Sequence, residues 1–156
     1  MTIINNKILK GLKLTNYKFE KKPLVVGGLA MEYYGLRKTG HDYDYMVSKK
    51  DWKKLKKLHP KKINLFGGKT EKDLDATINL KKEKVDLIST LYQHNYNDLV
   101  KGAINKDKYK IISLEKLLYI KTIDAVFKNT KKSKNDQILM VNDIIKKKYS
   151  NNKKKN

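Results

Sequence analysis

A pair of glycines followed closely by a pair of aspartates is the part of this chain best suited to chemistry. Gly27 and Gly28 end an apolar run, and Asp42 and Asp44 follow within one short helix-like stretch and a turn. Side chains on a strand alternate between its faces, so Asp42 and Asp44 should point to the same side. Carboxylates at this spacing beside a glycine turn favour a divalent cation held against phosphates.

A third acid is needed for two-metal phosphoryl transfer, in which the metals stabilise both the attacking and the leaving oxygen. Asp86 is the best candidate, because it lies in a strand-like run after a polar turn. Each motif alone has a plainer interpretation. A glycine pair is usually a turn, the pattern lacks the third glycine of a dinucleotide fingerprint, and two spaced aspartates also occur in calcium loops. The ordered combination is what favours catalysis.

The segment from Val26 to Val47, with Asp86 after it, resembles the minimal nucleotidyltransferases of the DNA polymerase β superfamily. Their signature is a glycine pair at a helix start, an Asp-x-Asp or Asp-x-Glu on the next strand, and an acid on a later strand. The likeness extends over about Leu24 to Ile145, with Thr39-Gly40-His41 as a departure just before the acids.

The resemblance implies an Mg²⁺-dependent (or Mn²⁺-dependent) enzyme that moves a nucleoside monophosphate from an NTP such as ATP to an acceptor hydroxyl. Asp42 and Asp44 would ligate the metal. Asp86 would ligate a second metal and assist deprotonation of the acceptor. Gly27 and Gly28 would cradle the triphosphate, since free N–H groups at a helix start attract anions.

Two cations are expected to neutralise that triphosphate. Arg37 is the sole arginine of the chain, and its planar fork of donors suits phosphate; the alternative is that it complements a helix end. Lys121 falls on the apolar stripe that Leu114 and Leu117 define, so its amine should either extend to the surface or reach the nucleotide.

Composition bounds the remaining possibilities. The 156 residues predict one domain over residues 1–150, followed by a disordered basic tail at 151–156. The chain has no cysteine, no apolar run of membrane-spanning length and no secretory signal, so we expect an intracellular, cytoplasmic protein without a membrane partner. Nothing in the sequence indicates an oligomeric state.

The formal net charge of +21 attracts polyanions, and RNA is therefore a possible partner or acceptor. The same charge is explained equally well by an AT-rich genome that favours lysine codons. Two other functions stay open: a non-catalytic nucleic-acid- or protein-binding module on the same fold, and a nucleotidyltransferase-type toxin that modifies RNA or protein.

Periodicity predicts an α/β (α+β) protein with a small mixed sheet of about 4–6 strands, flanked by helices and followed by C-terminal helices. Ser48 should cap a helix that ends before Pro60, and the second glycine pair, Gly67-Gly68, should be a loop. The other expected helices are residues 3–14, 29–36, 113–128 and 134–148, and the expected strands are 24–26, 42–47, 63–66, 76–80, 85–89 and 109–112.

Overall fold

The computed structural model describes residues 2–66 and 75–153, so Gly67-Gly68 and the last three residues of the expected tail lie outside the described part. The chain groups into two compact units, Met1–Ser113 and Leu114–Asn156, which are described separately. The sequence predicted a single domain over residues 1–150, and this grouping divides that range after Ser113.

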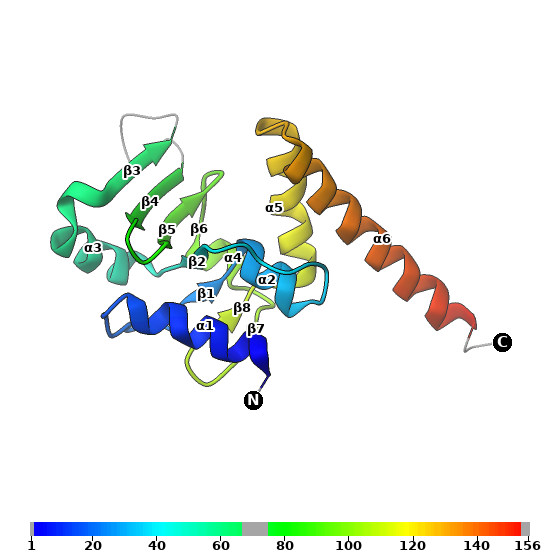
Figure 1. Cartoon of the computed structure of the whole chain (residues 1–156), viewed down its shortest axis with the longest axis horizontal. Coiled ribbons are helices and arrows are strands. Elements are labelled where there is room, and N and C mark those ends of the chain that lie inside the picture. Colours follow the sequence, from blue (N-terminus) through cyan, green and yellow to red (C-terminus); the bar gives the residue numbers. More distant parts are fainter. Residues whose placement is uncertain (1, 67–74, 154–156) are drawn as a thin grey trace. The chain divides into compact units, whose positions relative to one another are not determined.

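The first unit is built on one mixed sheet of eight strands (Figure 1). Its order is β3-β4-β5-β2-β1-β8-β7, with β6 paired to β5. The pairs β2–β5 and β1–β8 are parallel, and the other pairs are antiparallel. The strands are β1 (Leu24–Val25), β2 (Tyr43–Met46), β3 (Ile63–Phe66), β4 (Asp75–Leu80), β5 (Val85–Leu91), β6 (His94–Asn95), β7 (Ile104–Asn105) and β8 (Lys110–Ile111).

The α/β class and the mixed sheet are confirmed, whereas the expected count of about 4–6 strands is too low. The additional strands are β6 and β7, which have two residues each and lie partly or fully exposed. So short a strand has no periodicity to detect.

Helices precede, interrupt and follow the strands of this sheet (Figure 1). The first unit contains α1 (Ile3–Leu14), α2 (Gly27–Tyr33), α3 (Lys49–Leu58), a 3₁₀ turn at Pro60–Lys62 and α4 (Tyr96–Leu99). The second unit is the helix pair α5 (Leu114–Phe127) and α6 (Lys131–Lys153). The helix α6 therefore continues three residues into the segment expected to be a disordered tail. Within the described ranges, no helix combines the length and apolar character needed to cross a bilayer.

The strand β2 presents its tyrosines to α1 and its acid to the opposite face. Gly11 of α1 packs so closely on Tyr43 and Tyr45 that a Cβ there would overlap both side chains. The buried Tyr45 hydroxyl donates to the Ile8 carbonyl at 2.8 Å. Alternation along the strand then directs Asp44 away from α1.

The start of α3 is fixed by a fully buried carboxylate. Ser48 caps the helix as the sequence predicted, with its Oγ accepting from the Asp51 N–H at 3.1 Å. Asp51 in turn accepts from the Tyr17 hydroxyl and from the Glu20 and Lys21 N–H groups at 2.9–3.2 Å. Burial, together with the bond to Asp51, raises the pKa of Tyr17 to about 12. Asp51 thereby ties the segment that leads into β1 to the helix that follows β2.

Candidate functional site

Two of the three predicted acids lie next to each other on adjacent strands. Asp44 of β2 and Asp86 of β5 are register partners in a parallel pair. Partners in such a pair project to the same face of the sheet. Pairing of β2 with β5 joins strands separated by α3, β3 and β4, so tertiary structure brings these two carboxylates together.

The third acid, Asp42, directly precedes β2 and is exposed. Its negative charge contributes to a raised pKa of the Asp86 carboxyl, for which burial is the larger cause. The Asn79 amide opposes this effect by donating to Asp86 from the neighbouring strand β4. Asp42, Asp44 and Asp86 therefore belong to one neighbourhood of the first unit, at the beginning of β2 and β5.

The glycine pair reaches the same place from β1. The Val26 N–H donates to the Asp44 carbonyl at 3.2 Å, which aligns the turn after β1 with Asp44. Gly27 has φ +59°, a conformation that suits glycine. A Cβ on Gly27 would overlap the Asp44 carboxylate, with the Asp44 Cγ only 3.2 Å away. Glycine is therefore required here both by the backbone and by the approach of Asp44.

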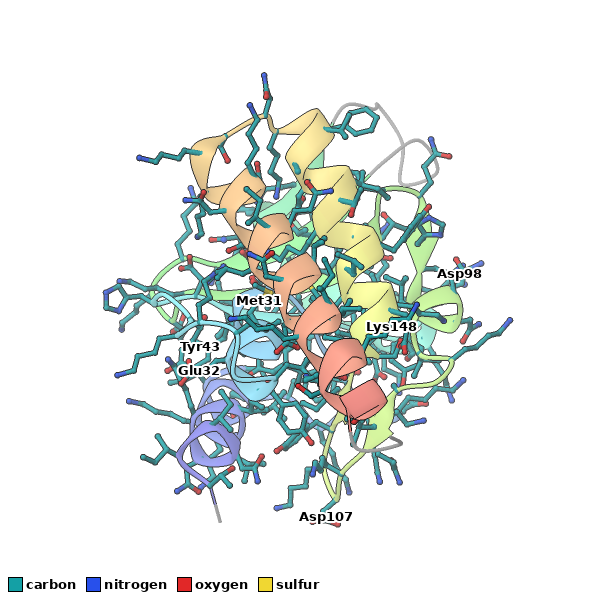
Figure 2. The ribbon with its side chains drawn as sticks, turned by 90° about the vertical axis from the view of Figure 1, so that its right-hand side faces the viewer. Met31, Glu32, Tyr43, Asp98, Asp107 and Lys148 are labelled. Atoms are coloured by element: carbon teal, nitrogen blue, oxygen red, sulfur yellow. The ribbon has the colours of Figure 1, made fainter. Side chains whose placement is uncertain are left out.

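A further contact fixes the loop between α2 and β2, which leads to the acids. A Cβ on Gly28 would stand 2.5 Å from the Thr39 Oγ1, so Thr39 packs directly on the second glycine. The Thr39 N–H donates to Glu32 at 2.8 Å, and Lys7 of α1 forms an ion pair with the same carboxylate at 3.1 Å. Glu32 lies on α2 next to Met31, and both are labelled in Figure 2.

Sequence reasoning missed Asn79, Glu32 and Thr39. Asn79 had a usable signal, because a hairpin closed by the turn 81–84 pairs residue 80 with 85 and residue 79 with 86. Glu32 and Thr39 gave no comparable signal, since their bond depends on how the loop after α2 folds back.

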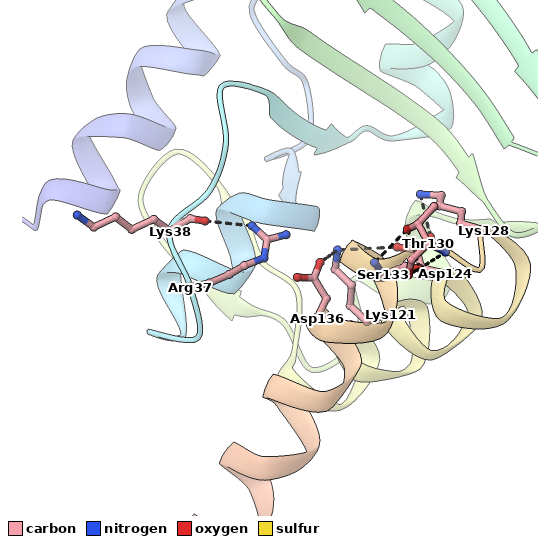
Figure 3. A network of polar contacts seen from close by, with 8 residues as sticks. All are labelled: Arg37, Lys38, Lys121, Asp124, Lys128, Thr130, Ser133 and Asp136. Carbon is pink, nitrogen blue, oxygen red and sulfur yellow. Dashed lines mark hydrogen bonds and ion pairs between the residues drawn. The ribbon is translucent and has the colours of Figure 1, made fainter.

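The two predicted phosphate-binding cations have protein contacts of their own. Arg37, half-buried after α2, donates from Nη1 to the Lys38 carbonyl at 3.0 Å (Figure 3). Lys121 of α5 is buried, and its Nζ lies 2.9 Å from Asp136 and 3.8 Å from Asp124 (Figure 3). The expectation that Lys121 extends to the surface is therefore replaced by a buried ion pair within the second unit.

Oxygen ligands of this kind suit a hard cation such as Mg²⁺. The neighbouring charges of Asp42 and Asp86 also create the like-charge repulsion that a cation relieves. Across the residues that the structure describes, no three histidine, aspartate or glutamate side chains are grouped so that they could hold a metal ion as they stand. The donor chemistry thus fits the cation, and holding it would require side-chain adjustment around Asp44 and Asp86.

Comparisons with protein-family models, with curated proteins and with solved structures gave no match.

Proposed function

We propose that this protein is a metal-dependent nucleotidyltransferase that moves a nucleoside monophosphate from an NTP to an acceptor hydroxyl. The observation that supports the proposal best is the pairing of Asp44 with Asp86 on parallel strands, with Gly27 against Asp44. Acids from two neighbouring strands and a glycine turn from a third meet at one end of the central strands β5, β2 and β1, which is an arrangement suited to phosphate chemistry.

In this proposal Asp44 and Asp86 hold the cation, and Asp42 joins them by a change of side-chain rotamer. The bound Mg²⁺ or Mn²⁺ supplies neutralisation of the phosphate charge. Gly27 and Gly28 would cradle the triphosphate through their backbone at the start of α2. Arg37 and Lys121 remain proposed phosphate contacts, and Lys121 would have to exchange its pairing with Asp136 for that role.

Asp86 is the proposed proton acceptor. Its carboxyl accepts a hydrogen bond from the Asn79 amide, and its pKa is raised above the ordinary value by burial and, to a smaller extent, by the Asp42 charge. The acceptor oxygen would attack the α-phosphorus while its proton passes to Asp86. The bond from that phosphorus to the bridging oxygen would break, and pyrophosphate would leave.

A transfer assay tests this proposal directly. Labelled NTPs with Mg²⁺ or Mn²⁺ should label a component of total RNA or protein when the parent chain is present. Asp44→Asn and Asp86→Asn remove a charge at nearly constant volume, so each should lower transfer by at least about tenfold while the fold survives. Asp107→Asn is the matched control, since Asp107 is an exposed aspartate of the same unit (Figure 2).

Equal transfer by the parent and by both site variants would remove these acids from the reaction. Thermal unfolding gives an independent readout, because a ligand that binds the folded state raises the melting temperature. Mg²⁺ with an NTP should therefore shift the parent and Asp107→Asn upward, and Asp44→Asn much less.

The second candidate is a non-catalytic module that binds nucleic acid or another polyanion. The formal net charge of +21 favours it, because such a charge attracts polyanions without any catalytic site. A parent protein that transfers nothing, yet binds RNA equally before and after Asp44→Asn, would favour this module.

A further inference from the structure

A cavity lies in the first unit, away from the paired acids. It has a volume of about 540 Å³ and lies between the first turns of α3, the end of β5 and the short helix α4. Ser89 and Thr90 line it, three and four residues beyond Asp86 on the same strand. At the usual rise per residue, they lie about 10–13 Å along β5 from Asp86. The cavity is therefore separate from the neighbourhood of Asp42, Asp44 and Asp86.

The helix α3 contributes two lysines to the wall of this cavity. Lys49, Trp52 and Lys53 all line it, and their spacing places them on one face of the helix. Lys50 and Lys54 on the neighbouring face form ion pairs with Glu20. Among the described residues, Lys49 and Lys53 of the cavity wall form no ion pair with a carboxylate.

Trp52 adds a donor without an acceptor. Its side chain is 2% exposed, and its indole N–H is buried with no hydrogen-bond partner among the described residues. Buried polar groups in proteins are nearly always hydrogen-bonded, so an unsatisfied donor beside a cavity indicates a missing acceptor. Tyr96, whose hydroxyl donates to the Lys22 carbonyl at 2.7 Å, contributes a second aromatic ring to the wall.

We propose that this cavity binds a small organic anion. Its anionic oxygens pair with Lys49 and Lys53, its apolar body lies against the Trp52 and Tyr96 rings, and one ligand oxygen accepts from the indole N–H after a small turn of the ring. Phosphate and carboxylate head groups share this chemistry. The proposal is independent of the nucleotidyltransferase reaction, because it involves none of the residues assigned to that reaction.

The chain carries one tryptophan and ten tyrosines, so fluorescence excited beyond the tyrosine absorption reports on Trp52 in the wall of this cavity. Four probes separate the contributions of head and body: phenyl phosphate, benzoate, uncharged phenol and inorganic phosphate. With excitation beyond the phenyl absorption, at least one organic anion should change the emission saturably, with an affinity at least about tenfold higher than that of phenol or of inorganic phosphate. Equal responses to all four probes, or no response to any, would overturn the proposal.

Variants locate the binding. Lys49→Gln combined with Lys53→Gln should lower the affinity for the organic anion by at least about tenfold. Lys57→Gln combined with Lys61→Gln is the control, because these exposed lysines lie outside the cavity wall and their loss changes the net charge equally. The same weakening in both pairs would mean that the anion responds to overall charge and would overturn the site.

Trp52→Phe keeps an aromatic ring and removes the indole donor. Since it also removes the fluorescence signal, thermal unfolding is the readout, and the upward shift that the organic anion gives the parent should be reduced. An unreduced shift in Trp52→Phe would exclude the indole N–H from the site. If Trp52→Phe is unfolded before any ligand is added, the Lys49→Gln and Lys53→Gln pair, at exposed positions, tests the cavity in its place.

Discussion

At the scale of the residue, the candidate active site depends on the absence of a side chain at Gly27. Its φ of +59° and the close approach of Asp44 are two separate reasons why glycine is required, and substitution can distinguish them. Gly35 has φ +70° at the end of α2 with nothing within 4 Å of a Cβ, so it makes only the first demand. The two glycines are therefore a matched pair.

Gly35→Ala should lower the free energy of unfolding by about 1–2 kcal/mol, the cost of a left-handed conformation for a side-chain-bearing residue. Gly27→Ala should cost about 1–3 kcal/mol more, because the Asp44 carboxylate must move. It should also lower nucleotidyl transfer, whereas Gly35→Ala should not. Chemical denaturation of both variants and the transfer assay check this. Equal losses of unfolding free energy in the two variants would mean that the Asp44 carboxylate moves aside without cost.

The ionisation of Glu32 makes the stability of the folded protein depend on pH. Burial raises its pKa, but the hydrogen bond from the Thr39 N–H and the ion pair with Lys7 lower it more, so the net shift is downward. A folded pKa below the unfolded value of 4.5 stabilises the protein above that value, and this stability is lost as the pH falls through the folded pKa.

Glu32→Gln should therefore lower the melting temperature near pH 6 and make its fall toward about pH 3 shallower than in the parent. Lys7→Met keeps the Thr39 bond and removes the ion pair, so its profile should lie between the other two. Melting temperatures across this range provide the measurement. Parallel profiles for the parent and Glu32→Gln would contradict the linkage.

At the scale of the element, the pair α5 and α6 is joined by a buried ion pair where the sequence indicated an apolar stripe. The side chains of Lys121 and Asp136 are 10% and 3% exposed. Removing one member of a buried pair leaves the other as a buried charge that has lost its counter-ion, which costs far more than the pair itself contributes. Asp124, by contrast, also pairs with Lys128 at 3.0 Å.

Lys121→Met should lower the free energy of unfolding by about 3–5 kcal/mol. Adding Asp136→Asn should recover part of that loss, because the uncompensated charge is then removed as well. Urea denaturation of the single and double variants measures both effects. If the single variant were as stable as the parent, the lysine would contribute nothing at its buried position, and a purely ligand-binding role would gain support.

Element prediction succeeded where the signal is local. The helix α1 has the predicted bounds, Ser48 caps α3 as expected, and the β4–β5 hairpin follows from its turn. The pairing of β2 with β5 could not be read in this way, because it joins distant segments through tertiary structure. Periodicity placed Lys121 on the apolar stripe of its helix, but its partner Asp136 belongs to another helix and was not identified.

At the scale of the whole molecule, the net charge of +21 makes an ionic contribution to binding unavoidable. Neutralising nucleic-acid phosphates releases counter-ions, so added salt weakens such binding steeply. Lysines distributed over the chain produce this effect with or without a catalytic site, and it therefore has to be separated from catalysis by experiment.

Affinity for single-stranded RNA should fall at least about tenfold between about 50 mM and about 200 mM salt. Asp44→Asn should leave the slope unchanged, because one carboxylate barely alters the charge of the molecule. Filter binding or fluorescence anisotropy over a salt series checks this. Binding that ignores salt would show that base contacts, and not overall charge, hold the RNA.

The parallel pairing of β1 with β8 also has a consequence for biosynthesis. Leu24 and Val25 are made early and pair on one side with β2, whereas Lys110 and Ile111 on the other side are made much later. During translation, one edge of β1 in the nascent chain therefore stays unpaired until β8 has been synthesised. Unpaired edges promote association between chains, so ribosome-bound intermediates ending before Lys110 should be the species most in need of a chaperone.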